Sequence, residues 1–457
     1  MQTHKKELRR LNSARESTTS FYPHFGKNKK QEIIRLLYEI SKREGGSPLN
    51  IIQGASRLIS NKSSPRIFPI LKKHLLKLRY PYSFSENTPP RAYLPKLDLK
   101  DSWVCSLQEK AFYPKNILIE KKASDSYLIG RLKQHFPKAK FSQIQSFKKY
   151  RHSQQGDAIK SYNKRRDTLF VINELFDFFK KCPCTKGANG CGYHIFNLGF
   201  GCIFECSYCY LQRYTNSPGI IIPANINTFF DRLASYKRSR MHIGTGEFLD
   251  SLALDNITGF SVEIAEFFKN HTAMTFEFKT KSANIGNLLK IKPARNIVIS
   301  WSLNPRRIIK ENEFFTPGLE QRLKAAQKCA KAGYRIGFHF DPVVYYPQWH
   351  NEYNALIELL FDHLNPKDIA WMSIGTFRFK PGLKQVIERR FPENKILNQE
   401  MVLGFDNKLR YPHTIRYEIY LKMLDMLRQH NKKLKLYLCM EEALIWKKLK
   451  LKLPNLT

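Results

Sequence analysis

Acidic residues are scarce in this chain of 457 residues. It has 39 Asp and Glu against 77 Lys and Arg, so its formal net charge is +38. A protein with such a charge attracts polyanions, because binding to a phosphate backbone releases the counterions condensed on it. The composition therefore favours nucleic acid or another polyanion as a partner. A compositional bias that only aids solubility is the competing explanation.

Long apolar runs are missing as well. No segment approaches the roughly 20 apolar residues that a membrane-spanning helix requires, so we expect no contact with a membrane. The opening MQTHKKELRRLNSARESTTS has no apolar stretch like that of a secretory signal peptide. A cytoplasmic location is the resulting expectation.

The cysteine pattern differs from that of a secreted, disulfide-rich protein. Such scaffolds are short and dense in cysteine, whereas this long chain has nine, five of them between Cys182 and Cys206. Cysteines clustered in this way indicate metal or redox chemistry in a reducing compartment.

We expect three regions along the chain. Residues 1–110 form a basic, mainly helical extension without an assigned function, 111–175 a small basic α/β region, and 176–457 the large domain. Within the second region, residues 131–166 carry eleven basic residues against one acidic residue, with aromatic residues between them. This pattern fits phosphate contact with base stacking, and it equally fits a solvated face whose rings point inward. The second region is thus a candidate nucleic-acid contact.

After residue 190, short apolar strands alternate with amphipathic helices. YHIFNLGF, TFEFKTK, NIVISWSLN and RIGFHFDPV are among the expected strands. Repeated β–α units predict an α/β fold with a parallel sheet, open or closed into a barrel. Ligands of such folds bind at the carboxyl ends of the strands.

Three cysteines follow the first of these strands in GFGCIFECSYCYLQRY. Cys202, Cys206 and Cys209 have the spacing C-x3-C-x2-C. A structural zinc site needs a fourth ligand, and no second C-x2-C pair follows; Cys329 and Cys439 stand alone. Three thiolates on a four-iron cluster leave one iron open to a substrate or cofactor. This open-iron site is the favoured interpretation, with zinc or a redox site as alternatives.

The motif, with Tyr208 before its third cysteine, resembles the signature of the radical S-adenosylmethionine (AdoMet) superfamily. From about residue 112 onward the chain resembles the spore photoproduct lyase family, most clearly in CSYCYLQ, FKTK and SWSLN. The resemblance implies a partial parallel (β/α)6 barrel with a [4Fe–4S] cluster on the three cysteines. It also implies AdoMet, a 5′-deoxyadenosyl radical that abstracts hydrogen from a DNA lesion, and an external electron donor such as flavodoxin or ferredoxin.

The resemblance further implies roles for particular side chains. Tyr208 and Tyr210 are the expected catalytic residues. Asp341, at the end of the strand in FHFDP, is expected to contact the ribose of AdoMet, with a helix cap as the competing role. The other expected AdoMet-binding residues are Thr245, Gly246, Glu247, Lys281, Ser302 and Asn304.

One position departs from the family. Gly244 stands where spore photoproduct lyase has the cysteine that returns a hydrogen atom to the product, and glycine has no thiol. Tyr208, Tyr210 or another cysteine would have to substitute. A second group, Cys182, Cys184 and Cys191, could donate hydrogen, bind a second metal with His194, or form a redox pair.

Two other functions stay open at this point. One is radical modification of RNA or protein instead of DNA. The other is a non-catalytic iron–sulfur protein that binds nucleic acid, which would not need the residues expected around AdoMet.

Overall fold

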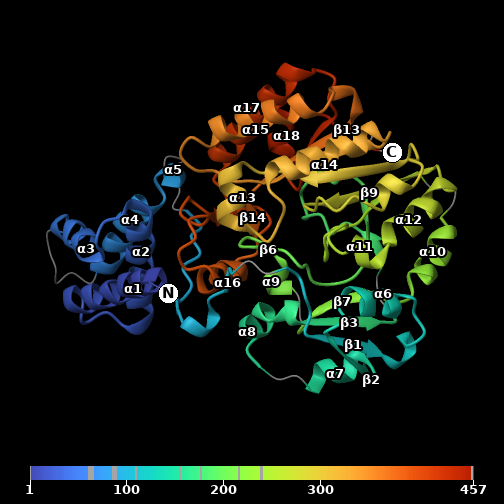
Figure 1. Cartoon of the computed structure of the whole chain (residues 1–457). Coiled ribbons are helices and arrows are strands. Elements are labelled where there is room, and N and C mark those ends of the chain that lie inside the picture. The colour runs from blue at the N-terminus through green and yellow to red at the C-terminus, as the bar shows by residue number, and fades with distance from the viewer. Residues whose placement is uncertain are drawn as a thin grey trace. The chain divides into compact units, whose positions relative to one another are not determined.

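The computed structural model describes residues 2–59, 66–84, 90–108, 111–153, 156–174, 178–214, 217–236, 240–453 and 456. The chain divides into two compact units (Figure 1). The first comprises Met1–Cys105 and Thr376–Glu418, and the second comprises Ser106–Gly375 and Ile419–Thr457. The region boundaries expected at 110 and 175 fall outside the described residues.

The first unit is built mainly from helices. The segment NKKQEIIRLLYEISKRE lies in α2, which ends where Gly45 adopts φ +83°, a left-handed conformation that suits glycine. Ser47 caps the next helix by accepting a hydrogen bond from the Asn50 backbone, with Pro48 in the first turn. Its N-terminal helices are α1 (Gln2–Phe21), α2 (Lys27–Glu44), α3 (Pro48–Arg57), α4 (Ile67–Arg79) and α5 (Pro81–Phe84).

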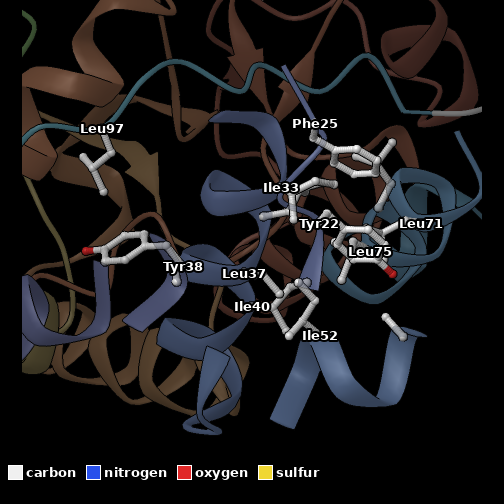
Figure 2. Close-up of a cluster of buried hydrophobic side chains, with 14 of the residues drawn as sticks. Tyr22, Phe25, Ile33, Leu37, Tyr38, Ile40, Ile52, Leu71, Leu75 and Leu97 are labelled. Atoms are coloured by element: carbon white, nitrogen blue, oxygen red, sulfur yellow. The ribbon is translucent and has the colours of Figure 1, made fainter. Parts of the chain in front are cut away.

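The apolar faces of these helices share one core. Tyr22, Ile33, Leu37 and Leu75 are among its buried side chains, and they come from α2, α4 and the turn that follows α1 (Figure 2). The unit thus has a hydrophobic core of its own. The returning segment adds α16 (Gly382–Arg390), the start of α17 (His413–His430) and the antiparallel strands β14 (Arg378–Phe379), β16 (Leu409–Arg410) and β15 (Val402–Leu403).

The second unit contains a small parallel sheet with the strand order β2-β1-β3-β7. NILIE and TLFVI form its two central strands, whose residues are largely buried. The fourth strand, β7, comes from the chain that follows the cysteine motif. The elements are β1 (Asn116–Glu120), α6 (Leu128–His135), β2 (Lys140–Ile144), α7 (Phe147–Ser153), α8 (Ala158–Asn163), β3 (Thr168–Ile172) and β7 (Ile220–Pro223).

The larger sheet of this unit has eight strands among the described residues, in the order β17-β13-β12-β10-β9-β8-β5-β4. Pairing is parallel from β5 to β12 and between β13 and β17, while β4 pairs antiparallel with β5. Its strands are β4 (Phe179–Lys181), β5 (Tyr193–Phe196), β8 (Met241–Gly244), β9 (Met274–Thr280), β10 (Ile297–Ser302), β12 (Arg335–Val343), β13 (Ile369–Thr376) and β17 (Leu436–Leu438).

The strands of this sheet are buried on both faces, as expected when helices cover a parallel sheet. The connecting helices include α10 (Ile226–Ala234), α12 (Phe260–Lys269), α14 (Leu319–Lys331) and α15 (Trp349–His363), seen around the sheet in Figure 1. The α/β fold with a curled, largely parallel sheet confirms the expected partial barrel. Within the described residues, no helix is both long and apolar enough to pass through a lipid bilayer.

A charged group lies inside the sheet layer. Glu277 on β9 is fully buried and accepts hydrogen bonds from Trp371 at 3.2 Å. His339 and His242 lie 2.7 Å and 3.0 Å from its two carboxylate oxygens. The Nδ1 atom of His339 is 2.6 Å from the hydroxyl of Ser373. His339 is therefore a core residue whose polar atoms are satisfied.

Candidate active site

The cysteine motif lies on a tight loop between β5 and α9 (Leu211–Tyr214). Gly199 and Gly201 have φ values of +141° and +88°, which residues with side chains rarely adopt. An added Cβ at Gly199 would collide with the backbone of Ile221. Phe200 and Ile221 exchange backbone hydrogen bonds of 3.0 and 2.8 Å. The glycines thus allow the loop to pack directly against β7 of the small sheet.

Arg165 holds this loop through hydrogen bonds and an ion pair. Its fully buried guanidinium donates to the carbonyls of Cys202 at 3.2 Å and Phe204 at 2.7 Å. It also pairs with Glu205 at 2.6 Å. Sequence reasoning counted Arg165 among the basic residues of 131–166 and missed this role. No local pattern distinguishes it from its exposed neighbours.

The three cysteines lie close enough to affect one another's pKa. Burial raises the pKa of Cys202 to about 12, and the charge of Cys209 adds to the increase. Burial also raises the pKa of Cys206 and Cys209, while the nearby Lys281 charge acts in the opposite direction on both. Buried thiols that oppose each other's ionisation are stabilised as thiolates by a bound metal.

This donor set fits an iron–sulfur cluster. Across the described residues, no three His, Cys, Asp or Glu side chains are arranged as ligands of a single metal ion. A four-iron cluster binds each thiolate through a different iron, so its ligands lie farther apart than those of one ion. The spacing of Cys202, Cys206 and Cys209 is therefore compatible with the expected cluster.

Glu313 lies directly opposite the motif and was not found from the sequence. It pairs with Cys206 in the short antiparallel ladder of β6 (Glu205–Cys206) and β11 (Glu313–Phe314). Its carboxylate accepts hydrogen bonds from the Tyr208 hydroxyl and from Asn304 at 2.9 Å. Arg322 forms an ion pair with it at 2.7 Å, and both side chains are fully buried. The segment KENEFFTPG around Glu313 contains no recognisable motif.

Charges around Glu313 keep it ionised. Burial by itself would raise its pKa, but the cations of Arg322 and Lys281 lower the pKa of Glu313 to about 2. The same interaction shifts the pKa of Lys281 in the opposite direction. Burial acts to lower its pKa, yet the negative charges of Glu313 and Cys206 leave the pKa of Lys281 raised. A permanently charged ammonium group thus lies beside the cysteine motif.

Lys281 is held by the turn that follows β9. The buried carboxylate of Asp250 accepts hydrogen bonds from the Lys281 backbone at 2.7 Å and from the Thr280 hydroxyl at 2.6 Å. The Lys281 ammonium lies 5.9 Å from the centre of the Tyr208 ring. Asp250 is therefore a structural residue of this site, and it connects the end of β8 to the end of β9.

The GTGE segment follows β8 at the same edge of the sheet. Thr245 donates its backbone N–H to the backbone carbonyl of Glu277 at 3.0 Å. Gly246 has φ +101°, and its backbone lies close to Lys279. Glu247 pairs with Lys180 at 3.1 Å, and its carbonyl accepts a hydrogen bond from Tyr210. Burial raises the pKa of Glu247. Within this segment Thr245 is buried, Gly246 is exposed and Glu247 is half-buried.

Gly244 has no space for a side chain. An added Cβ would collide with the hydroxyl of Tyr193 and lie 2.7 Å from the carbonyl oxygen of Glu277. Tyr193 is held in this place because its hydroxyl donates to the Thr245 carbonyl at 3.0 Å. The absence of a thiol at this position is therefore matched by an aromatic side chain that fills its volume.

The remaining expected residues lie at the ends of the next strands. The carbonyl of Ser302 accepts a hydrogen bond from Arg322 at 2.9 Å. Asn304 accepts from the Tyr353 hydroxyl at 2.7 Å, so its amide belongs to the Glu313 network. Asp341 lies within β12, which continues to Val343, and α15 begins only at Trp349. The helix-cap alternative for Asp341 is thus excluded.

The aromatic residues of 131–166 mostly point inward. Phe147 and Tyr150 pack on Phe170 with ring centres 5.0 and 5.4 Å away, and Phe136 and Tyr162 are buried. These rings are not available to stack on bases. The exposed basic side chains of this segment include Lys133, Lys138, Lys140, Lys148, Lys149, Arg151, Lys160 and Lys164.

Residues 112–439 match the family model described as spore photoproduct lyase. Spore photoproduct lyase of Clostridium acetobutylicum is 28% identical over 246 residues, which cover 52% of this chain and 71% of that protein. The enzyme of Bacillus subtilis is 26% identical over 303 residues, covering 63% of this chain and 85% of that protein.

Solved structures agree in fold. A cysteine-to-alanine mutant of spore photoproduct lyase superposes with a TM-score of 0.63 at 24% identity, covering 72% of this chain and all of that one. A double mutant with bound AdoMet and dinucleoside spore photoproduct gives a TM-score of 0.62 at 24% identity, over 73% of this chain and 100% of that one. With most of its length matched by the family model, the chain belongs to the spore photoproduct lyase family of radical AdoMet enzymes, which use a [4Fe–4S] cluster and AdoMet.

Proposed function

We propose that the protein is a radical AdoMet lyase that acts on a photoproduct lesion in DNA. The observation that carries this proposal is the grouping of Cys206, Tyr208, Lys281 and Glu313 at one end of the sheet. A sensor that only needed to hold a cluster would have no use for a buried ammonium group beside it. When bound, the cluster and AdoMet supply a reducing electron and a 5′-deoxyadenosyl group that takes hydrogen from the substrate.

The chain's own residues would hold and orient these groups. Cys202, Cys206 and Cys209 would ligate three irons. Lys281, kept charged by Glu313, would attract the AdoMet carboxylate, and Glu247 would accept from its ammonium group. The other binding residues in the proposal are Thr245, Gly246, Ser302, Asn304 and Asp341.

Tyr210 is the better placed of the two proposed catalytic tyrosines. Tyr208 is half-buried, and its hydroxyl donates to Glu313. Burial raises the pKa of both tyrosines well above the usual value, so their contacts distinguish them and the pKa does not. Tyr210 is 39% exposed, and its hydroxyl reaches only the Glu247 carbonyl in the described contacts. We therefore assign Tyr210 to the hydrogen relay and Tyr208 to positioning.

The exposed lysines of 131–166 support a nucleic-acid substrate. They would contact phosphates, and the lesion would have to leave the duplex to reach the strand ends. RNA or protein as substrate is the alternative within the same chemistry. An external donor such as flavodoxin or ferredoxin would supply the electron. The nine cysteines, none of them in a disulfide, support a reducing, cytoplasmic location.

The test is anaerobic reconstitution with iron and sulfide, followed by dithionite and AdoMet. Wild type should produce 5′-deoxyadenosine, and the Cys206→Ala variant should produce none. Cys329→Ala is the matched control, because this buried cysteine lies on α14, away from the motif. Equal product from Cys206→Ala and wild type would overturn the radical assignment.

The substrate is tested separately with irradiated DNA and irradiated RNA. Thymine restored within the irradiated DNA, with a loss of at least tenfold in Tyr210→Phe, is the expected result. Turnover of AdoMet without any change in irradiated DNA would reject the DNA-lesion substrate while leaving the radical chemistry in place.

A further inference from the structure

Four cysteines outside the proposed cluster come together in the second unit. Cys182, Cys184 and Cys191 lie between β4 and β5, and Cys439 directly follows β17. In the sequence Cys439 looks isolated, because about 250 residues separate it from the other three. Only the fold brings the two segments into one neighbourhood.

The two segments belong to opposite edges of the larger sheet, since β4 and β17 are its terminal strands. The loop after β4 nevertheless reaches the chain after β17. Ala188 forms an isolated antiparallel bridge with Glu442, and Asn189 donates its N–H to the Glu441 carbonyl at 3.2 Å. The loop thus spans the opening between the two edges of the partial barrel.

Backbone hydrogen bonds hold the main chain that carries the cysteines on each side. Cys182 donates its N–H to Tyr193 at 2.8 Å, and Cys439 donates to Ile374 on β13 at 2.8 Å. Cys184 donates to the Cys182 carbonyl at 2.7 Å, which places these two residues in a tight turn. A Cβ built on Gly190 would lie 3.9 Å from the Cys184 sulfur, so the residue before Cys191 borders that thiol.

The side chains interact with one another. Cys182 and Cys184 are joined by a side-chain hydrogen bond, which is the main cause of the raised pKa of Cys182. Burial adds to the increase, followed by the charges of Cys184, Cys439 and Cys191. Burial likewise raises the pKa of Cys191. All four are partly exposed, so the thiols are accessible to an ion from solvent.

We propose that Cys182, Cys184, Cys191 and Cys439 form a four-thiolate metal centre that joins the two edges of the barrel. The chemistry calls for a thiophilic metal, held as a single Zn²⁺ ion or as an iron–sulfur cluster. With Zn²⁺, four S–H bonds give their protons to solvent as four Zn–S bonds form, and no redox change is needed. An iron–sulfur cluster would be bound already assembled from iron and sulfide, and again only four protons leave the thiols. His194, the ligand suggested by sequence, instead stacks its ring on Phe179, with centres 5.5 Å apart.

Binding requires the thiols to turn toward a common point. In the part of the chain that the structure describes, neither this group nor the motif cysteines are already set as ligands of one ion. Gly187 and Gly192, with φ values of +84° and +74°, shape the loop that carries three of the four ligands.

The experiment separates this centre from the proposed cluster. In a full-length variant with Cys202, Cys206 and Cys209 all changed to Ser, zinc and iron are measured per chain after loading with Zn²⁺, or with iron and sulfide. We expect one zinc, or a cluster with its own visible absorption, to remain. Adding Cys439→Ser should remove it, and adding Cys329→Ser should not.

Cobalt provides a second readout that does not depend on activity. Co²⁺ bound by four thiolates gives an intense sulfur-to-metal absorption, which Cys439→Ser should weaken at least twofold relative to Cys329→Ser. Equal metal content and equal cobalt spectra in these two variants would overturn the proposal. If the triple variant fails to fold, the same comparison in otherwise unchanged protein decides, because Cys439→Ser must then lower the total metal per chain. A failure here leaves AdoMet cleavage intact, so it is distinguishable from failure of the proposed function.

Discussion

Individual residues explain why the motif loop has its shape. Arg165 and Glu205 form a buried pair under the loop, and Glu313 connects Tyr208, Asn304 and Arg322 beside it. Buried ion pairs contribute little net stability, but loss of one partner leaves an uncompensated charge. These residues are therefore sensitive positions although none of them belongs to the cysteine motif.

Arg165→Met should strongly destabilise the second unit. It leaves Glu205 buried without its cation and removes two hydrogen bonds to the loop, at a cost of about 3–5 kcal/mol. Iron incorporation should fall as well, because the loop loses its support. Urea unfolding and iron content measure the two effects. Lys164→Met, an exposed neighbour, is the control, and an equal effect in both variants would contradict the assignment.

Gly244→Ala should destabilise the protein by about 1–3 kcal/mol, because the new methyl group collides with Tyr193 and overpacks the core. Gly130→Ala is a matched control. It lies within α6 with nothing within 4 Å of the added methyl group, so we expect a gain of about 0.4–1 kcal/mol. Unfolding in urea compares the two, and a neutral Gly244→Ala would show that Tyr193 gives way.

At the scale of elements, helix α2 is held by charges as well as by its apolar face. Glu39 accepts from Arg35 at 2.6 Å and from Arg79 on α4 at 2.8 Å. Lys384 on α16 donates to the same carboxylate at 2.7 Å. Burial would raise the pKa of Glu39, but these three cations lower it. The network connects the first helices to a segment about 350 residues later in the chain.

Glu39→Gln should therefore cost the first unit about 3–5 kcal/mol, since three buried cations lose their common anion. Glu44→Gln, at the end of the same helix and half exposed in its pair with Arg43, should cost less than about 1 kcal/mol. Circular dichroism during urea unfolding reports on this helical unit. Similar losses in the two variants would show that the network is not important for stability.

The interior of the larger sheet should make the protein sensitive to acid. Burial lowers the pKa of His339 from 6.5. As the pH falls below about 6.5, the unfolded chain therefore binds a proton at this histidine more readily than the folded protein does, and the free energy of unfolding decreases. Burial would raise the pKa of Glu277, but His339 and His242 lower it well below 4.5, so its contribution is lost as the pH falls below that value. The free energy of unfolding should decrease in both ranges. His339→Gln should remove the first decrease, and an unchanged profile would contradict this explanation.

At the scale of the whole molecule, the excess of positive charge is a property of the surface. Several acidic side chains of the first unit, Glu7, Glu39, Glu388 and Glu400, are buried. Exposed positions of α1 carry Lys5, Lys6, Arg9 and Arg15. The same unit also buries cations, among them Arg35, Arg79 and Lys384, so the positive charge of its surface comes from the exposed Lys and Arg residues.

Affinity for DNA should fall steeply with salt, with the slope of log K against log salt close to the number of phosphates contacted. Changing Lys148, Lys149 and Arg151 to Gln should lower that slope by about 1–3, because these exposed cations would each lose a phosphate contact. Fluorescence anisotropy at several salt concentrations measures it. A flat response in wild type would remove the phosphate-binding proposal.

The alternation of strands and helices, the helix α2 and the motif of Cys202, Cys206 and Cys209 follow from local sequence, because hydrophobic periodicity and residue spacing are local properties. The same signals place Lys281, Ser302 and Asn304 at strand ends, where a parallel sheet collects them on one edge. These features depend only on where a residue lies along its own strand, so they can be predicted without knowing which distant residues it contacts.

Other features depend on contacts that the sequence does not encode locally. Glu313 reaches Tyr208 across 105 residues, and Cys439 joins the loop after β4 only because the sheet curls and its edges are bridged. The sequence likewise left open whether the aromatic rings of 131–166 face the core or are free to stack on bases. In the structure, Phe147 and Tyr150 of this segment point inward and pack on Phe170. Sequence by itself determined the fold class and the cysteine motif, whereas the tertiary structure decided which charged and thiol groups surround that motif, because only close packing brings distant segments within hydrogen-bonding range.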